Sequence, residues 1–144
     1  MVQHLQKDKD DSRMRKKKTA RAKLKKLAYD LQSEWVRRKD ALDDIATCVT
    51  CGHRAHWKQL SQGHFVPDGG RNSTKFELTN IHVQCRRCNI NLGSNGPVYY
   101  KFMVEKYGQD HVDYLISLAY KTEKYNEQWF EDRIKFLRDK LNEL

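Results

Sequence analysis

Two cysteine pairs constrain this chain more than any other feature of its sequence. Cys48 and Cys51 form one CxxC turn, and Cys85 and Cys88 form another. Each turn presents two thiolates to one ion, so two turns complete the tetrahedral sulfur set that holds structural zinc. The 33 residues between the pairs are too many for a single zinc finger but enough for two strands and a loop. We therefore expect structural Zn²⁺ to close a small subdomain.

Pairing of the same cysteines as disulfides requires an oxidising compartment. The chain begins Met1-Val2-Gln3-His4 and continues with charged residues, so it lacks the apolar core of a signal peptide. No apolar run approaches the roughly 20 residues needed to span a bilayer. From these features we expect a cytoplasmic protein with no membrane partner.

The positive charge lies almost entirely at the N-terminus. The net charge is +9, and residues 1–39 hold 14 Lys and Arg against 5 Asp and Glu, whereas residues 40–144 hold 14 against 14. A basic segment binds phosphate through counterion release, without regard to sequence. The simpler alternative is a solubilising tail. The DNA-contact candidates in this segment are Arg15, Lys16, Lys17, Lys18, Lys25 and Lys26.

Hydrophobic periodicity and turn residues predict an α+β protein. Strands are expected at residues 62–66 and 81–85, separated by a loop rich in Pro, Gly, Asn and Ser, and followed by a helix over 85–92. The apolar stripe of the basic helix is Ala20, Leu24, Leu27, Leu31 and Trp35. The predicted organisation is a flexible basic arm (1–18), a basic amphipathic helix (19–46), a zinc-bound core (47–96) and about three C-terminal helices packed on that core (97–144).

Two polar residues, one between the cysteine pairs and one just after them, suit phosphodiester hydrolysis, which needs a base and a charge-stabilising cation. His64 ends the first predicted strand and is the candidate base. Asn89 follows the last cysteine and offers a carbonyl oxygen to Mg²⁺ or Mn²⁺. The alternatives are a structural histidine and a helix-capping asparagine. His53 and His56 could replace a thiolate on zinc or contact phosphate, but we expect them to be solvent-exposed side chains of the turn that carries the first cysteine pair.

The order of these residues resembles the HNH, or ββα-metal, nuclease motif. That resemblance implies that His64 is the base, that Asn80 fixes it, and that Asn89 on the following helix binds the catalytic cation. An asparagine directly after a zinc cysteine is similar to the arrangement in phage endonuclease VII. The implied fold is a zinc-stapled ββα-metal (HNH-like) core.

A closer resemblance, from about Leu31 onward, is to the lambdoid phage NinG proteins, also called Rap, a family of recombination endonucleases. It implies metal-dependent cleavage of branched DNA, such as Holliday junctions and D-loops, by a homodimer in the host cytoplasm. The segments that carry it are Trp35 to Asp40, Cys48 to Gly52, Gly63-His64-Phe65, Asn80 to Cys85, Cys88-Asn89 and Tyr107 to Val112.

Gly63 departs from the general HNH pattern, in which Asp often precedes the base and binds metal. The similar DRGH nucleases also have Gly there and hold magnesium chiefly through one Asn and water. His82 is the candidate second ligand, since strand alternation places it on the opposite face from Ile81 and Val83, where it is expected to face the cleft.

The predicted core is itself electropositive, because residues 48–101 carry 7 Lys and Arg against 2 acids. Arg71, Lys75, Arg86 and Arg87 are its DNA-contact candidates. Two alternatives to a branch-specific nuclease remain: a non-catalytic zinc DNA-binding module, and a general HNH nuclease acting on linear duplex.

Overall fold

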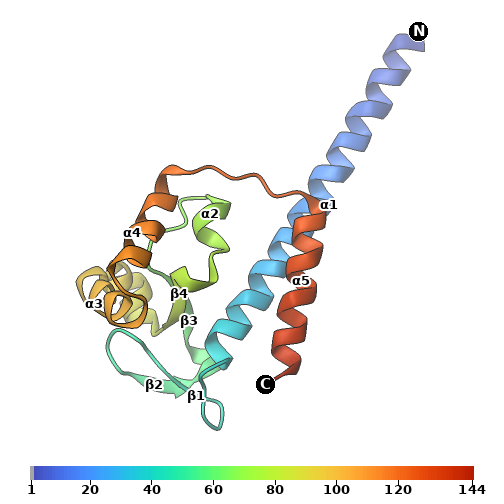
Figure 1. Ribbon diagram of the computed structural model, residues 1–144. Coiled ribbons are helices and arrows are strands. Elements are labelled where there is room, and N and C mark those ends of the chain that lie inside the picture. The colour runs from blue at the N-terminus through green and yellow to red at the C-terminus, as the bar shows by residue number, and fades with distance from the viewer. Residues whose placement is uncertain (1) are drawn as a thin grey trace.

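The N-terminal segment forms one long helix. The computed structural model describes residues 2–144, with side chains from residue 5 onward, and α1 runs without a break from Val2 to Arg38. Its N-terminal half projects away from the rest of the molecule (Figure 1). The expected boundary between residues 18 and 19 therefore has no counterpart in the secondary structure; residue 1 of the predicted arm lies outside the described part. Side-chain pairs one turn apart, such as Arg15 with Asp11 at 3.6 Å, support the projecting segment.

The C-terminal half of α1 packs on the body through a face that differs from the predicted stripe. Ala28, Gln32 and Val36 are fully or almost fully buried, whereas Leu27 remains 36% exposed. Gln32 is the reason for the shift: its Nε2 donates to the carbonyl of Lys75 (2.9 Å) and to Oε1 of Gln62 (3.3 Å). A buried polar residue that finds partners elsewhere in the fold cannot be recognised from apolar periodicity.

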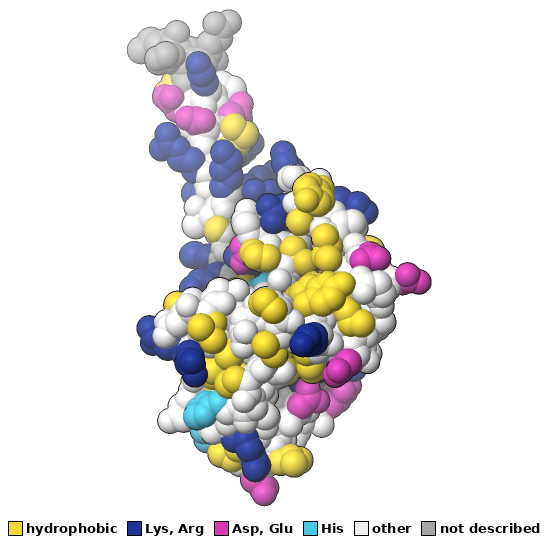
Figure 2. All heavy atoms as spheres, turned by 90° about the vertical axis from the view of Figure 1, so that its left-hand side faces the viewer, with side chains coloured by type: hydrophobic (Ala, Val, Ile, Leu, Met, Phe, Trp, Pro, Cys, Tyr) yellow, Lys and Arg dark blue, Asp and Glu magenta, His cyan; other side chains and the backbone are white. Residues whose placement is uncertain are grey.

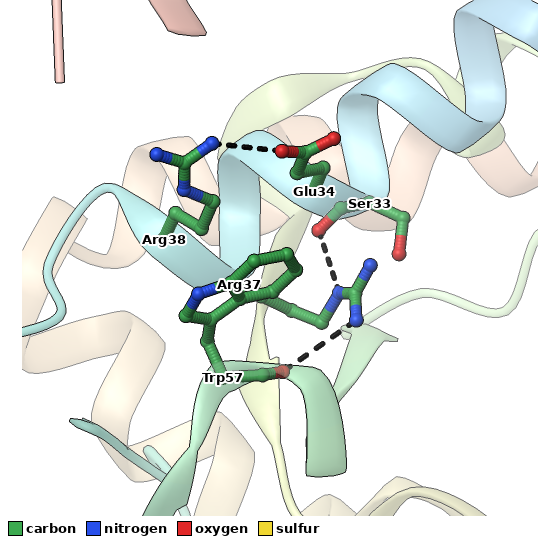
Figure 3. Close-up of polar contacts among 5 residues, drawn as sticks. All are labelled: Ser33, Glu34, Arg37, Arg38 and Trp57. Atoms are coloured by element: carbon green, nitrogen blue, oxygen red, sulfur yellow. Dashed lines mark hydrogen bonds and ion pairs between the residues drawn. The ribbon is translucent and has the colours of Figure 1, made fainter. Parts of the chain in front are cut away.

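The end of α1 is fixed to the turn that precedes the central hairpin (Figure 3). Arg37 Nε donates to the carbonyl of Ser33 (3.0 Å) and its Nη1 to that of Trp57 (3.5 Å). The guanidinium carbons of Arg37 and Arg38 lie 5.1 and 5.4 Å from the Trp57 ring centre, and Arg38 pairs with Glu34 at 2.7 Å. These contacts set the direction in which the helix leaves the body.

Two antiparallel hairpins follow. The first joins β1 (Ile45–Thr47) to β2 (Arg54–His56), and the second joins β3 (Ser61–His64) to β4 (Ile81–Gln84). In the second, Gly63 lies opposite His82 and His64 opposite Ile81. This hairpin confirms the two predicted strands with slightly shorter bounds, while the first was not predicted because its strands are only three residues long. The loop after β3 contains a short helix, α2 (Asn72–Lys75).

The predicted helix over 85–92 is wrong in form. After β4 the chain makes a π-helical turn, Arg87–Asn91, and then a 3₁₀ turn, Gly93–Asn95. Positive φ values at Gly93, Ser94 and Asn95 (54°, 70° and 53°) interrupt any continuous helix there. A regular helix, α3 (Gly96–Tyr107), begins only after this interruption.

The remaining helices pack in two places. α4 (Gln109–Ser117) packs against α3, and these helices bury Tyr99, Met103, Val112 and Leu115 together with Val66. α5 (Glu127–Asn142) begins at the Asn126 cap and lies alongside α1, not on the hairpin (Figure 1). Within residues 2–144, no helix is both long and apolar enough to cross a membrane.

Candidate functional site

The four cysteines converge on one point. Their sulfur atoms, from Cys48, Cys51, Cys85 and Cys88, all lie within 4.8 Å of one another, and those of Cys51 and Cys85 are 3.6 Å apart. Tetrahedral thiolates at the usual zinc–sulfur distance of about 2.3 Å are separated by roughly 3.8 Å. The set therefore fits a metal ion such as Zn²⁺, and none of the four is in a disulfide.

The electrostatics of the cluster also favour a bound cation. Although the backbone N–H of His53 acts in the opposite direction, burial and the neighbouring cysteines raise the pKa of Cys51 to about 12. Four ionised thiolates at these distances need a positive charge among them, which a divalent metal supplies. The cluster also packs against the hairpin core through Leu60 and Val83. A metal there would hold the end of β4 against β1.

His64 ends β3 and faces α1. Its Nε2 lies 3.2 Å from the carbonyl oxygen of Lys75, and its ring stacks on that of Tyr29 with centroids 6.4 Å apart and planes 10° from parallel. A carbonyl only accepts hydrogen bonds, so Nε2 carries the proton. Burial lowers the pKa of His64, against a smaller opposing effect of the Lys75 carbonyl. The neutral imidazole therefore keeps Nδ1 as its basic nitrogen.

Asn80 holds the loop that supplies this carbonyl. Its Oδ1 accepts from the backbone N–H of Val66 (2.8 Å), and its Nδ2 donates to the carbonyls of Val66 (2.9 Å) and Thr74 (3.0 Å). The side chain is completely buried. Asn80 makes no hydrogen bond to the His64 ring; it ties together the backbone two residues after His64 and one residue before Lys75.

Basic side chains gather beside His64. The ammonium of Lys75 lies 4.7 Å above the Tyr29 ring. Burial, followed by the charges of Lys75 and Arg21, lowers the pKa of Lys25 on α1. A bound anion would reduce the repulsion between these like charges. The carboxylate of Asp68 acts in this direction, since its charge raises the pKa of both Lys25 and His64 against the larger effect of burial.

His82 occupies a different environment from the one expected. It is 3% exposed, with Nδ1 at 2.9 Å from the hydroxyl of Tyr99 and Nε2 at 2.7 Å from that of Tyr107. Both ring nitrogens therefore have protein partners, and the expectation that His82 faces a cleft and binds the cation is wrong for this structure. Strand alternation did place it correctly on the opposite face from Ile81 and Val83.

Gly63, the position where many HNH enzymes have Asp, is filled by a neighbour. A Cβ added to Gly63 would lie 1.9 Å from Oε1 and 2.6 Å from Cδ of Gln84. Gln84 is fully buried, and its Nε2 donates to the Ser94 carbonyl (2.8 Å) and contacts the Thr50 hydroxyl (3.1 Å). The Gln84 amide thus occupies the space of any side chain at position 63.

Asn89 lies in the π-helical turn directly after the cysteine cluster and is half-buried. Its backbone N–H donates to the carbonyl of Cys85 at 3.0 Å. Over the described residues its side-chain amide has no hydrogen-bond partner in the protein, and no hydrogen bond joins it to His64. Its carbonyl oxygen is therefore uncommitted and chemically suited to a hard cation.

The structure divides the predicted DNA-contact residues into groups. Lys16, Lys17 and Lys18 are exposed on the projecting part of α1, where basic side chains gather (Figure 2). Arg86 and Arg87 line a hollow beside the cysteine cluster. Arg15 and Lys26 pair with acids on their own helix. Arg71 folds over its own loop and donates to the carbonyl of Pro67.

Several residues of this region were not predicted. Tyr29, Gln32, Gln84, Tyr99 and Tyr107 all contact the hairpin that carries His64, directly or through one another. No motif marks them, because they come from α1, α3 and the end of β4 and meet only in the folded chain. For Gln84 no local signal existed either, because β4 alternates apolar Ile81 and Val83 with polar His82 and Gln84.

Comparison with known proteins supports the resemblance to the NinG proteins of lambdoid phages. The family described as Bacteriophage Lambda NinG protein matches residues 2–144. The chain belongs to the NinG family. Among its curated relatives is Protein ninG of Salmonella phage P22, 25% identical over 136 residues, which covers 84% of this chain and 66% of that protein.

Two further NinG relatives align over a shorter region. Protein ninG of Escherichia phage 933W and that of Escherichia phage lambda are each 27% identical over 103 residues, or 66% of this chain. The chain spans about half the length of these two proteins, 51% and 50% respectively. No solved structure matches the chain.

Proposed function

We propose that this NinG-family chain is a metal-dependent endodeoxyribonuclease that cleaves branched DNA, such as Holliday junctions and D-loops. The observation that carries the proposal is the state of His64. Its Nε2–H is committed to the Lys75 carbonyl and its pKa is lowered by burial. A neutral imidazole with one nitrogen fixed and the other basic is the form in which histidine activates water.

The surrounding residues support the role of base. Asn80 fixes the backbone on both sides of the loop, at Val66 and Thr74, and Gln32 donates to the same Lys75 carbonyl that accepts from His64. The acceptor that selects the tautomer of His64 is thus itself held by a second donor. Positioning of this kind is a main source of catalytic rate.

Asn89 is the residue that we assign to the catalytic cation, Mg²⁺ or Mn²⁺. When bound, the cation would supply stabilisation of negative charge on the phosphate and on the leaving oxygen. One asparagine oxygen suffices if water and substrate phosphate complete the shell, as Mg²⁺ sites often do. With Gln84 in the space next to Gly63, and His82 held by two tyrosines, no second protein ligand is assigned.

Lys25, Lys75 and the projecting part of α1 would bind the DNA backbone. Lys75 lies over the Tyr29 ring on which His64 stacks, and Lys25 is close enough to Lys75 to feel its charge. Both would suit a phosphate near the cleaved bond. Lys16, Lys17 and Lys18 are exposed on α1, whose N-terminal half projects from the body (Figure 1). These contacts are to phosphate and carry no base readout, as expected of an enzyme that selects DNA shape. Cleavage of both strands of a two-fold junction needs two active sites, so we propose a homodimer.

Substitution of His64 tests the proposal. Zinc-loaded protein is incubated with a four-way junction and Mg²⁺, and His64→Ala is compared with His53→Ala, which alters an exposed histidine of the zinc knuckle. We expect His64→Ala to lose cleavage by at least about 100-fold while it keeps junction binding and zinc, and His53→Ala to cleave normally. Unchanged cleavage by His64→Ala would contradict the proposal.

The same assay separates the two alternatives. A non-catalytic zinc module would bind the junction without nicking it, whatever the metal. A general HNH nuclease would cut a linear duplex of matched sequence as fast as the junction. Measuring the mass of the protein alone and on the junction tests the dimer, and a monomer in both states would contradict it.

A further inference from the structure

A chain of hydrogen bonds runs from α3 into the strand that carries His64. The hydroxyl of Tyr99 lies 2.8 Å from the carbonyl oxygen of Gly63. Nδ1 of His82 lies 2.9 Å from the same hydroxyl, and Nε2 of His82 lies 2.7 Å from the hydroxyl of Tyr107. Tyr99 is fully buried and His82 is 3% exposed, so water does not compete for the inner members.

The direction of this chain follows from its last acceptor. A carbonyl only accepts, so the Tyr99 hydroxyl must donate to Gly63. Its proton is then committed, and it must accept from Nδ1–H of His82. Nε2 of a neutral His82 is left as an acceptor, and the Tyr107 hydroxyl donates to it. The Gly63 carbonyl, as an obligatory acceptor, therefore determines the donor and the acceptor of each hydrogen bond in this series.

The surroundings of His82 keep it neutral. Burial, followed by the charges of Lys106 and Lys39, lowers its pKa to about 3, against a smaller opposing effect of Asp40. The aromatic rings of Tyr99, Phe102 and Tyr107 pack around the imidazole. At any working pH the ring therefore has one donor and one acceptor, which is what the chain of hydrogen bonds requires.

We propose that Tyr107, His82 and Tyr99 form a one-directional relay that fixes the carbonyl of Gly63 and thereby the position of His64. His82 is a positioning residue that acts through Tyr99, Gly63 and His64, and not a metal ligand. The relay would act together with Gln84, whose amide packs against Gly63 on the same face of the hairpin. The catalytic part of this proposal rests on the proposed function of His64.

The tautomer of His82 tests the relay without any activity measurement. In ¹⁵N-histidine-labelled, zinc-loaded full-length protein, long-range ¹H–¹⁵N spectra should show His82 protonated at Nδ1 and unprotonated at Nε2, with no change between pH 8 and pH 5. A His82 protonated at Nε2, or one that titrates near the ordinary histidine value, would overturn the relay.

Kinetics test whether the relay positions the base. Tyr99→Phe removes the only side-chain donor to the Gly63 carbonyl in the described residues, and it should lower kcat on a four-way junction by about 10- to 100-fold without changing KM. Tyr100→Phe is the matched control, because Tyr100 is exposed on α3 and its hydroxyl donates instead to Gln109 of α4. His82→Gln, which retains a donor and an acceptor, should recover part of the rate that His82→Leu loses.

The outcomes distinguish this inference from the proposed function. If the wild-type protein cleaves and Tyr99→Phe, folded and zinc-loaded, has the same kcat, the positioning role is wrong although the nuclease assignment stands. If the wild-type protein does not cleave at all, the proposed function fails, and with it the positioning role. The tautomer of His82 still decides the relay itself, also where Tyr99→Phe fails to fold.

Discussion

The two faces of the β3–β4 hairpin each carry one histidine, and their environments differ. On the face toward α1, His64 has one ring nitrogen bound to a backbone carbonyl, and the other has no protein partner in the part of the chain that the structure describes. On the face toward α3, His82 has both nitrogens bound to tyrosine hydroxyls. The difference shows which imidazole is available for proton transfer. An imidazole with one hydrogen-bonded nitrogen can still accept a proton at the other, whereas one with both nitrogens hydrogen-bonded serves to support the structure.

The largest effect is expected from a substitution that disrupts the environments of both histidines together. Replacing Cys88, which is fully buried, by Ser should abolish zinc binding and lower the free energy of unfolding by several kcal/mol, since structural zinc binds zinc-finger peptides with about 10–16 kcal/mol. Zinc per chain by mass spectrometry and thermal melts by circular dichroism measure this. Thr47→Ala, an exposed residue next to Cys48 in the chain, is the control. A zinc-free variant that melts like the wild type would show that the hairpin does not need bound zinc for its stability.

Gly63→Ala should disturb the α3 face selectively. The added Cβ would lie 1.9 Å from Oε1 of Gln84, and overpacking of this kind typically costs about 1–3 kcal/mol. Chemical denaturation measures the loss, and Gln84→Ala in the same chain should recover part of it through pairwise coupling. Gly96→Ala is the control, since nothing lies within 4 Å of its added Cβ. Equal effects at the two glycines would refute the packing account of Gly63.

The sequence predicted what local pattern can encode. The cysteine spacing indicated the four-sulfur cluster, and strand alternation placed His82 on the opposite face from Ile81 and Val83. Which partners meet each histidine was not predictable, because Lys75, Tyr99 and Tyr107 reach them from separate elements. The interruption between the π-helical turn and α3 involves positive φ values at Ser94 and Asn95 as well as at Gly93, and among residue types only glycine indicates such a conformation reliably in a sequence.

The pH dependence of cleavage tests whether His64 is the base. Only neutral His64 is a base, so the rate should fall as the pH falls through its pKa, which burial places below the ordinary value of 6.5. The acid limb of the pH–rate profile on a four-way junction should therefore have its midpoint below 6.5. Zinc content is measured at each pH, because protonated thiolates release metal. A midpoint at or above 6.5 would count against His64 as the buried base.

The smallest effect is expected far from both histidines, on the projecting part of α1. Replacing Lys16, Lys17 and Lys18 by Ala should reduce the slope of log K against log salt by up to about 3, at roughly 0.9 per phosphate contact. The cleavage rate at saturating protein should not change. Lys135→Ala with Lys140→Ala is the control, because both lysines already pair with acids on or next to α5. An unaltered slope in the α1 variant would show that this segment does not contact DNA.

Chemical rescue of His64 tests the central claim most directly. His64→Gly removes the proposed base and leaves space beside Tyr29, so added imidazole can take its place. In single-turnover cleavage of a four-way junction with Mg²⁺, we expect the variant to be at least about 100-fold slower than the wild type and to regain rate as imidazole is added. A His64→Gly variant that cleaves at the wild-type rate without imidazole would contradict the assignment of His64 as the base.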